Sequence, residues 1–252
     1  MPEDALPAVT SELRALRARY AAFMDARVYP NETALAAGDD ASETLIEALR
    51  AQARDDGLWA PHIGPEAGGT GRGFLAYAFL NEAIGRSHWG QLVFGCQAPD
   101  AGNGEILELF GTGAQKAAWL RPLVAGEVRS FFGMTEPEVS GADPTTLAGT
   151  ARLDGDEWVI DAHKWFSSGA EGAGFGIVMV ITEPDAEPHR RASLMIVPAA
   201  APGVEIVRAI PVLGHTGRGW NTHCEVRLDG VRVPAANILG ERGDGFRIAQ
   251  KR

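Results

Sequence analysis

The spacing of apolar side chains along the chain changes near residue 128. Before that point, Leu13, Leu16, Tyr20 and Phe23 recur at intervals of three and four residues, which is typical of the buried face of an amphipathic helix. The same spacing predicts further helices near residues 40–56, 75–84 and 112–123. The first 127 residues therefore predict an all-helical domain.

Polar residues at the predicted helix ends support this interpretation. Asp40 followed by Glu43 resembles a capping pair, and Gly57 stands where that helix would end. Thr112 and Gln115 form the T-x-x-Q signature, in which each side chain bonds to the other residue's backbone N–H.

From Val128 onward the apolar runs are short and alternate with turn residues. EWVID, FGIVMVIT, ASLMIVP and GVEIVRAI all have the length of strands. Asp154–Gly155 and Asp229–Gly230 each predict a hairpin turn, because glycine readily adopts the positive φ that such turns require. The second half is therefore expected to be antiparallel β.

The expected fold class is α+β, with a helical domain at 1–127 and a middle antiparallel β-barrel domain at 128–240. The final residues FRIAQKR turn helical and stop in mid pattern. They are expected to begin a truncated C-terminal helical domain at 241–252.

Composition narrows the class of protein. The 252 residues are 45% hydrophobic and 22% charged, as in soluble globular proteins, and no apolar run has the length of a membrane span. The acidic start MPEDALPAV is unlike a secretory signal, so a cytoplasmic location is expected. A formal net charge of −10 argues against a nucleic-acid partner, and Cys96 and Cys224 predict buried thiols rather than a disulfide.

Several familiar chemistries lack their sequence context. The GGTGRG stretch at 68–73 does not follow a hydrophobic strand, as a dinucleotide-binding loop would. His215 and His223 are too few for a zinc site, so no metal is expected. The chain has no GxSxG motif that would present a nucleophilic serine.

Two polar motifs on either side of the first predicted hairpin carry a family resemblance. GMTEPEVSGAD at 133–143 and HKWFSSGA at 163–170 resemble the paired flavin motifs of acyl-CoA dehydrogenases. Taken singly, the first motif is equally explained as a turn and the second as an edge strand. Their order, together with the flanking GCQAPDAGN and VRVPAANILGERGDGF, makes the chain resemble that family over nearly its whole length.

The resemblance implies FAD as cofactor and assigns residues to its site. Met134 and Thr135 would offer N–H and hydroxyl donors to the pyrimidine end of the flavin, where negative charge accumulates on reduction. Phe166 would flank the ring, and the Ser168 hydroxyl would bond to flavin N5. The implied cofactor-binding residues are Phe132, Gly133, Met134, Thr135, Gly141, Phe166, Ser167 and Ser168.

The substrate contacts implied by the resemblance are less regular. Relatives place a serine immediately before the aspartate of this loop to contact the CoA part of the substrate, but here that position is Ala142, and Ser140 lies two residues earlier. Either Ser140 serves through another loop path, or the backbone of Ala142 does. The resemblance implies that the base is a Glu or an Asp in a C-terminal helical bundle, which this chain is expected not to reach. No catalytic base is nominated, because Glu136 and Asp143 both belong to the loop beneath the cofactor.

The implied activity is that of an oxidoreductase, the α,β-dehydrogenation of an acyl-CoA thioester in fatty acid β-oxidation. The resemblance also implies electron-transfer flavoprotein as a partner and a homo-oligomer, dimer or tetramer. The chain by itself is expected to bind FAD poorly and to turn over no substrate. Two alternatives stay open: a non-catalytic partner subunit, and a flavin-dependent oxidase or monooxygenase on the same fold.

Overall fold

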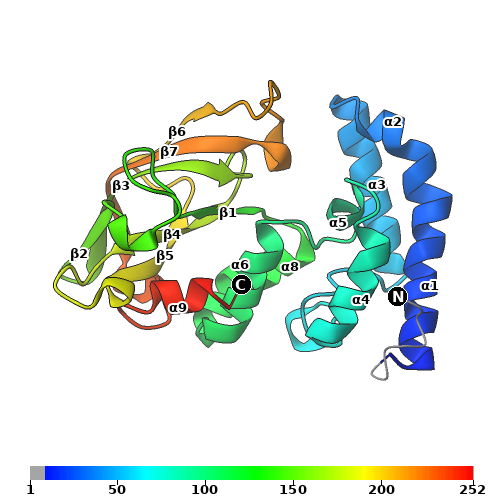
Figure 1. Ribbon diagram of the computed structural model, residues 1–252, viewed down its shortest axis with the longest axis horizontal. Helices are drawn as coiled ribbons and strands as arrows, with labels where there is room; N and C mark the ends of the chain where they lie inside the picture. Colours follow the sequence, from blue (N-terminus) through cyan, green and yellow to red (C-terminus); the bar gives the residue numbers. More distant parts are fainter. Residues whose placement is uncertain (1–8, 252) are drawn as a thin grey trace. The chain divides into compact units, whose positions relative to one another are not determined.

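The computed structural model describes residues 9–251 and divides into two compact units (Figure 1). The first unit ends at Gln97 and the second begins at Ala98. The first unit contains the longer helices α1 (Ser11–Phe23), α3 (Asp40–Asp55) and α4 (Phe74–Ile84), with short helical turns η2 (Met24–Val28), η3 (Tyr29–Asn31), α2 (Glu32–Leu35), η4 (Pro65–Ala67) and α5 (Gly90–Val93).

The first unit confirms the predicted helices and packs them around aromatic rings. Tyr20 and Phe23 on α1 are both buried, and the Tyr20 ring meets the Phe94 ring edge-on with 4.8 Å between their centroids. The predicted N-cap of α3, Asp40, was wrong by one residue. The N-cap is Asp39, whose carboxylate accepts the Ser42 N–H, and Asp40 lies in the first turn.

The second unit begins with helices that pack onto its strands (Figure 1). These are α6 (Asp100–Phe110), α7 (Gly113–Gln115), η5 (Lys116–Leu120) and α8 (Arg121–Ala125). Thr112 and Gln115 form the predicted capping box. The Gln115 amide also donates to the carbonyls of Ala236 and Ile238, both at 2.8 Å, and so ties these helices to the sheet region.

The strands form one eight-stranded, mostly antiparallel sheet, which confirms the α+β fold class. Along the main path the order is β6-β7-β3-β2-β4-β5-β8, and β1 pairs with β4 in parallel. The strands are β1 (Ser130–Gly133), β2 (Thr150–Asp154), β3 (Glu157–Ser168), β4 (Phe175–Ile181), β5 (Ala192–Pro198), β6 (Val204–Ala209), β7 (His223–Pro234) and β8 (Ile238–Leu239). Short turns η6 (Pro144–Thr146), η7 (Pro188–Arg190), η8 (Gly219–Asn221) and η9 (Ala235–Asn237) lie between them, and helix α9 (Gly245–Ala249) packs against β5 (Figure 1).

One of the two predicted hairpins exists and the other does not. Asp154 pairs with Glu157 across the tight turn between β2 and β3, as predicted. The hairpin predicted at Asp229–Gly230 was wrong, because β7 runs through both residues without turning back. They form an irregularity opposite Asp161, whose carboxylate accepts the Gly230 N–H at 2.8 Å. The positive φ of Gly230, 57°, serves a β-bulge rather than a turn.

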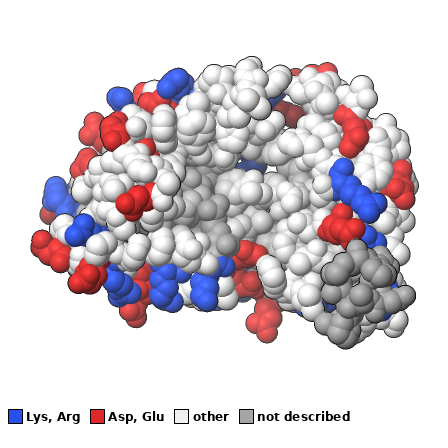
Figure 2. Space-filling model, in the orientation of Figure 1, with Lys and Arg blue, Asp and Glu red and all other residues white. Residues whose placement is uncertain are grey.

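The core of the sheet is built from the apolar side chains of β3, β4, β5 and β7, and Cys96 and Cys224 are both buried free thiols, as predicted. Within residues 9–251 no helix combines the length and apolarity needed to cross a bilayer. On the face drawn in Figure 2, Lys and Arg side chains of the second unit are interspersed with Asp and Glu.

Candidate functional site

The two motifs meet at the end of β1 and the end of β3. The Trp165 N–H donates to the Thr135 carbonyl at 3.1 Å, and the Thr135 hydroxyl donates to the Trp165 carbonyl at 3.0 Å. Two segments separated by a hairpin in sequence are therefore held side by side. Because the Thr135 hydroxyl hydrogen is used in this contact, the backbone N–H is the donor that Thr135 can still offer.

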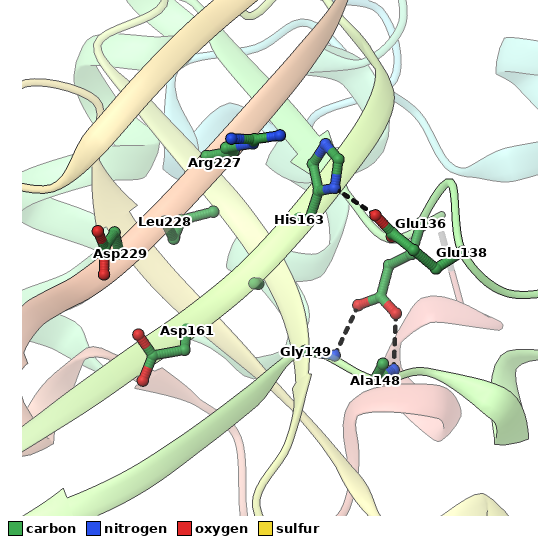
Figure 3. Close-up of a pocket in the computed structure, with 10 residues that line it drawn as sticks. Glu136, Glu138, Ala148, Gly149, Asp161, His163, Arg227, Leu228 and Asp229 are labelled. Atoms are coloured by element: carbon green, nitrogen blue, oxygen red, sulfur yellow. Dashed lines mark hydrogen bonds and ion pairs between the residues drawn. The ribbon is translucent and has the colours of Figure 1, made fainter.

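A buried ion pair lies beneath this contact. Lys164 Nζ lies 2.6 Å from Glu136 Oε1 and 3.0 Å from the Met134 carbonyl oxygen. The other contacts of Glu136 are the N–H groups of Ala148, at 2.6 Å to Oε2, and Gly149, at 2.9 Å to Oε1 (Figure 3). The carboxylate thus holds the far end of the loop that begins at Met134.

The charges of this pair follow from its partners and burial. The side chains of Lys164 and Glu136 are 0% and 2% exposed. The partners of the Glu136 oxygens are the N–H groups of Ala148 and Gly149 and the Lys164 amine, a set of donors that suits a carboxylate. Burial lowers the pKa of Lys164 below its ordinary value, and the Glu136 carboxylate opposes this shift. With Lys164 protonated, the pair carries one charge of each sign and no net charge.

A second irregularity in β3 presents Phe166 to solvent. Lys164 pairs with Val226 and Ser167 with Cys224, so Trp165 and Phe166 together face a single residue of β7. Phe166 takes a φ of 46°, a strained conformation for a residue with a side chain, and is 44% exposed. Strain of this kind is concentrated at functional sites.

The two serines after Phe166 point to different environments. Ser167 is fully buried, and its Oγ has no hydrogen-bond partner within residues 9–251. Its hydroxyl therefore does not reach the surface on which the Phe166 ring lies. Ser168 is partly exposed, and its Oγ lies 2.8 Å from His223 Nδ1, so this imidazole orients the hydroxyl.

The tip of the loop is exposed but folds back toward Thr135. Ser140, Gly141 and Ala142 are exposed, and the Asp143 N–H donates to the Ser140 carbonyl at 3.2 Å. A Cβ placed on Gly141 would lie 3.5 Å from Thr135 Cγ2. The structure thus brings Gly141 next to Thr135, whereas Ser140 and Ala142 face solvent.

The start of β1 is fixed by residues of the CQAPD-x-GN stretch. Asp100 Oδ1 accepts the N–H and the hydroxyl of Ser130, at 2.7 and 2.6 Å, and Asn103 Nδ2 donates to the carbonyl of Phe131 at 3.0 Å. Phe132 and Gly133 follow on this anchored strand. Helix α6 thereby fixes the position of β1 and of Met134, which follows it in the chain.

A hollow of about 420 Å³ lies between this loop and strands β3 and β7 (Figure 3). At its edge His163 stands between two carboxylates, with Nδ1 2.6 Å from Glu138 and Nε2 2.8 Å from Glu225. The hydrogen bonds from His163 and then from Arg208 lower the pKa of Glu225. None of the predicted cofactor residues lines this hollow.

Sequence reasoning missed three residues of the site: Glu136, Lys164 and His223. Glu136 and Lys164 belong to the two motifs, but nothing in their spacing indicates that they meet. A lysine inside a strand whose flanking residues are aromatic was the available signal, because such a lysine needs a buried partner. No local signal pointed to His223.

Comparison with known proteins identifies the family of both parts of the chain. The family model for the N-terminal domain of acyl-CoA dehydrogenases matches residues 10–127, and the model for the middle domain matches residues 131–231. "Probable acyl-CoA dehydrogenase FadE2" of Mycobacterium tuberculosis is 42% identical over 249 residues, which are 94% of this chain and 59% of that protein. "Acyl-CoA dehydrogenase family member 11" of Mus musculus is 38% identical over 242 residues, 91% of this chain and 31% of that protein.

The fold gives the same result. A Mycobacterium abscessus protein assigned as an acyl-CoA dehydrogenase has a solved structure that matches with a TM-score of 0.87 and 38% identity, covering 96% of this chain and 63% of that chain. The chain thus spans less than two thirds of the length of the relatives it matches. Its two matched domains, their order and the paired motifs place the chain in the acyl-CoA dehydrogenase family.

Proposed function

We propose that the loop beginning at Met134 and the bulge at Phe166 hold the flavin ring of FAD, in a protein that dehydrogenates an acyl-CoA thioester between its α and β carbons. One observation carries the proposal. The two motif segments are joined by reciprocal hydrogen bonds between Thr135 and Trp165, at 3.1 and 3.0 Å, so a single ligand can touch both.

The groups at this junction suit a flavin. The pyrimidine end of the ring carries hydrogen-bond acceptors, and the Thr135 N–H has no partner within the described chain, residues 9–251. The Phe166 ring is exposed one residue beyond Trp165 and offers an apolar flank that excludes water. When His223 Nδ1 carries its hydrogen, it donates to Ser168 Oγ and leaves the Ser168 hydroxyl hydrogen for a ligand acceptor.

FAD, when bound, supplies the hydride acceptor for the dehydrogenation. The residues of this chain bind and orient it, and the described loop offers no base. Both oxygens of Glu136 are occupied by donors inside the protein. The Asp143 carboxylate accepts the hydroxyl and the N–H of Thr145, and these bonds lower its pKa.

The remaining expectations concern the whole protein, because this chain spans 59% of its mycobacterial relative. They are an acyl-CoA substrate, electron-transfer flavoprotein as electron acceptor, assembly as a homo-oligomer and a cytoplasmic location. A second candidate function is a non-catalytic partner subunit. It is favoured by Ala142, which is exposed and has no hydroxyl for the CoA moiety.

The test is an anaerobic titration of the chain with FAD, followed by flavin fluorescence. We expect weak but saturable binding, and a loss of about tenfold in Phe166→Ala, which is what one aromatic contact is worth. Leu213→Ala is the matched control, because Leu213 is also a non-glycine residue at positive φ, 50°, and is 96% exposed. Failure to bind FAD, or equal binding by Phe166→Ala, would refute the site.

Addition of acyl-CoA thioesters to the FAD-loaded full-length protein separates the two candidate functions. Loss of the oxidised flavin absorbance supports the dehydrogenase. Binding of the thioester without loss of absorbance, in the full-length protein, supports the partner subunit.

A further inference from the structure

The Lys164 ammonium contacts a peptide carbonyl as well as the Glu136 carboxylate. Its Nζ donates to the Met134 carbonyl at 3.0 Å while it holds Glu136 Oε1 at 2.6 Å. A fully buried ammonium is thus aimed at the peptide that links Met134 to Thr135.

The geometry of that peptide fixes the direction of its other polar group. The bond between Met134 and Thr135 is trans, so its carbonyl and its N–H point in opposite directions. The ammonium lies on the carbonyl side. The Thr135 N–H therefore points away from Lys164 and from the buried ion pair.

This N–H is the open donor at the junction of the two motifs. The Thr135 hydroxyl donates to the Trp165 carbonyl, and the Thr135 carbonyl accepts the Trp165 N–H. Within residues 9–251 the Thr135 N–H has no hydrogen-bond partner, although Thr135 is partly exposed. An unused backbone donor held in a rigid position is suited to a ligand acceptor.

Charged hydrogen bonds are about twice as strong as neutral ones, and they polarise the groups that follow them. We propose that Lys164 is a positioning residue: its ammonium polarises the Met134–Thr135 peptide, so that the Thr135 N–H becomes a strengthened donor to the cofactor and favours its reduced, more negative form. This inference rests on the proposed flavin site and adds to it a residue that touches no ligand.

Glu136 has a separate role beside the Lys164 ammonium and the Met134–Thr135 peptide. It orients the Lys164 ammonium and offsets its charge, and its contacts with the Ala148 and Gly149 N–H groups hold the far end of the loop that begins at Met134. Removing the lysine charge and removing the glutamate charge change the net charge of the site in opposite directions. Lys164→Met leaves a net negative site, whereas Glu136→Gln leaves a net positive one.

The first experiment needs no cofactor. The amide signal of Thr135 is recorded by NMR in the chain, in Lys164→Met and in Glu136→Gln, with Lys116→Met as a control on turn η5. We expect the Thr135 amide proton to move upfield in Lys164→Met and downfield in Glu136→Gln, by more than any amide outside residues 133–149. Movement in the same direction in both variants, or no movement in Lys164→Met, would overturn the proposal.

The second experiment measures the affinity for reduced and oxidised FAD in the same proteins. We expect the preference for reduced flavin to fall at least fivefold in Lys164→Met and to hold or rise in Glu136→Gln. A purely structural role would weaken both forms equally in both variants and so overturn the inference. If no protein binds FAD while the amide shifts behave as expected, the proposed function fails and the polarised peptide stands.

Discussion

Removing either charge of the Lys164–Glu136 pair is expected to destabilise the second unit strongly. The two side chains are 0% and 2% exposed with 2.6 Å between Nζ and Oε1, so neither charge can regain water when its partner is lost. Breaking a buried pair from one side costs about 3–5 kcal/mol. We expect that loss in the free energy of unfolding for Lys164→Met and for Glu136→Gln alike.

The double variant sharpens the prediction. Glu136→Gln retains one side-chain oxygen, which can accept one of the two N–H groups of Ala148 and Gly149, and Lys164→Met fills the space of the lysine stem, so no charge stays buried. The costs that remain are mainly one unsatisfied N–H and the unsatisfied Met134 carbonyl, about 1–3 kcal/mol each. The double variant should therefore be more stable than the two single losses predict when added, by at least about 2 kcal/mol.

Urea unfolding followed by tryptophan fluorescence measures these differences, and hydrogen exchange at Ala148 and Gly149 reports the loop itself. An exposed pair in the same unit serves as control. Arg232 and Asp154 are 45% and 46% exposed, with Arg232 Nη2 2.5 Å and Nη1 3.0 Å from Asp154 Oδ2, so Arg232→Met should cost less than about 1 kcal/mol. Additive losses in the double variant, or single losses as small as this control, would refute the account of the pair.

Two further predictions concern the loop and the helical unit. A Cβ on Gly149 would lie 2.7 Å from Glu136 Oε1, so Gly149→Ala should lower the free energy of unfolding by about 1–3 kcal/mol through overpacking. A Cβ on Gly141 would meet nothing closer than 3.5 Å, so Gly141→Ala should change this free energy by no more than about 0.5 kcal/mol. Equal effects of the two substitutions in urea unfolding would contradict the geometry of the loop. Burial lowers the pKa of His62 from 6.5 to about 4. Between pH 6.5 and pH 4 the unfolded chain therefore binds a proton that the folded chain does not bind. The free energy of unfolding should fall by about 2 kcal/mol from pH 7 to pH 5. That loss should disappear in His62→Gln and persist in His88→Gln, an exposed histidine of the same unit.

Local signals predicted the local structure well. The capping box at Thr112 and the turn at Asp154 were confirmed because each is decided by residues within one turn of chain. The error at Asp229–Gly230 has the same origin. Its glycine supplies a positive φ that hairpins and bulges both use, and the choice is made by pairing with Asp161 on β3, far away in sequence.

The candidate site was predictable only as two separate segments. Their motifs indicated where a cofactor could bind, but not that Lys164 would reach the Met134 carbonyl, because this contact depends on how the segment after β1 lies against β3. The burial of the Ser167 side chain could not be predicted from the sequence either. It follows from the bulge at Trp165 and Phe166, which interrupts the alternation of side chains on which a sequence prediction depends.

Hydrogen exchange of the chain with and without FAD, read by mass spectrometry, tests the central claim most directly. The claim is that the segments following Met134 and Lys164 form one flavin site. We predict that FAD slows exchange in peptides covering 133–142 and 164–169 together, with the same dependence on FAD concentration. Protection of one segment without the other, or protection confined to the hollow lined by Arg227 and Asp229, would contradict it.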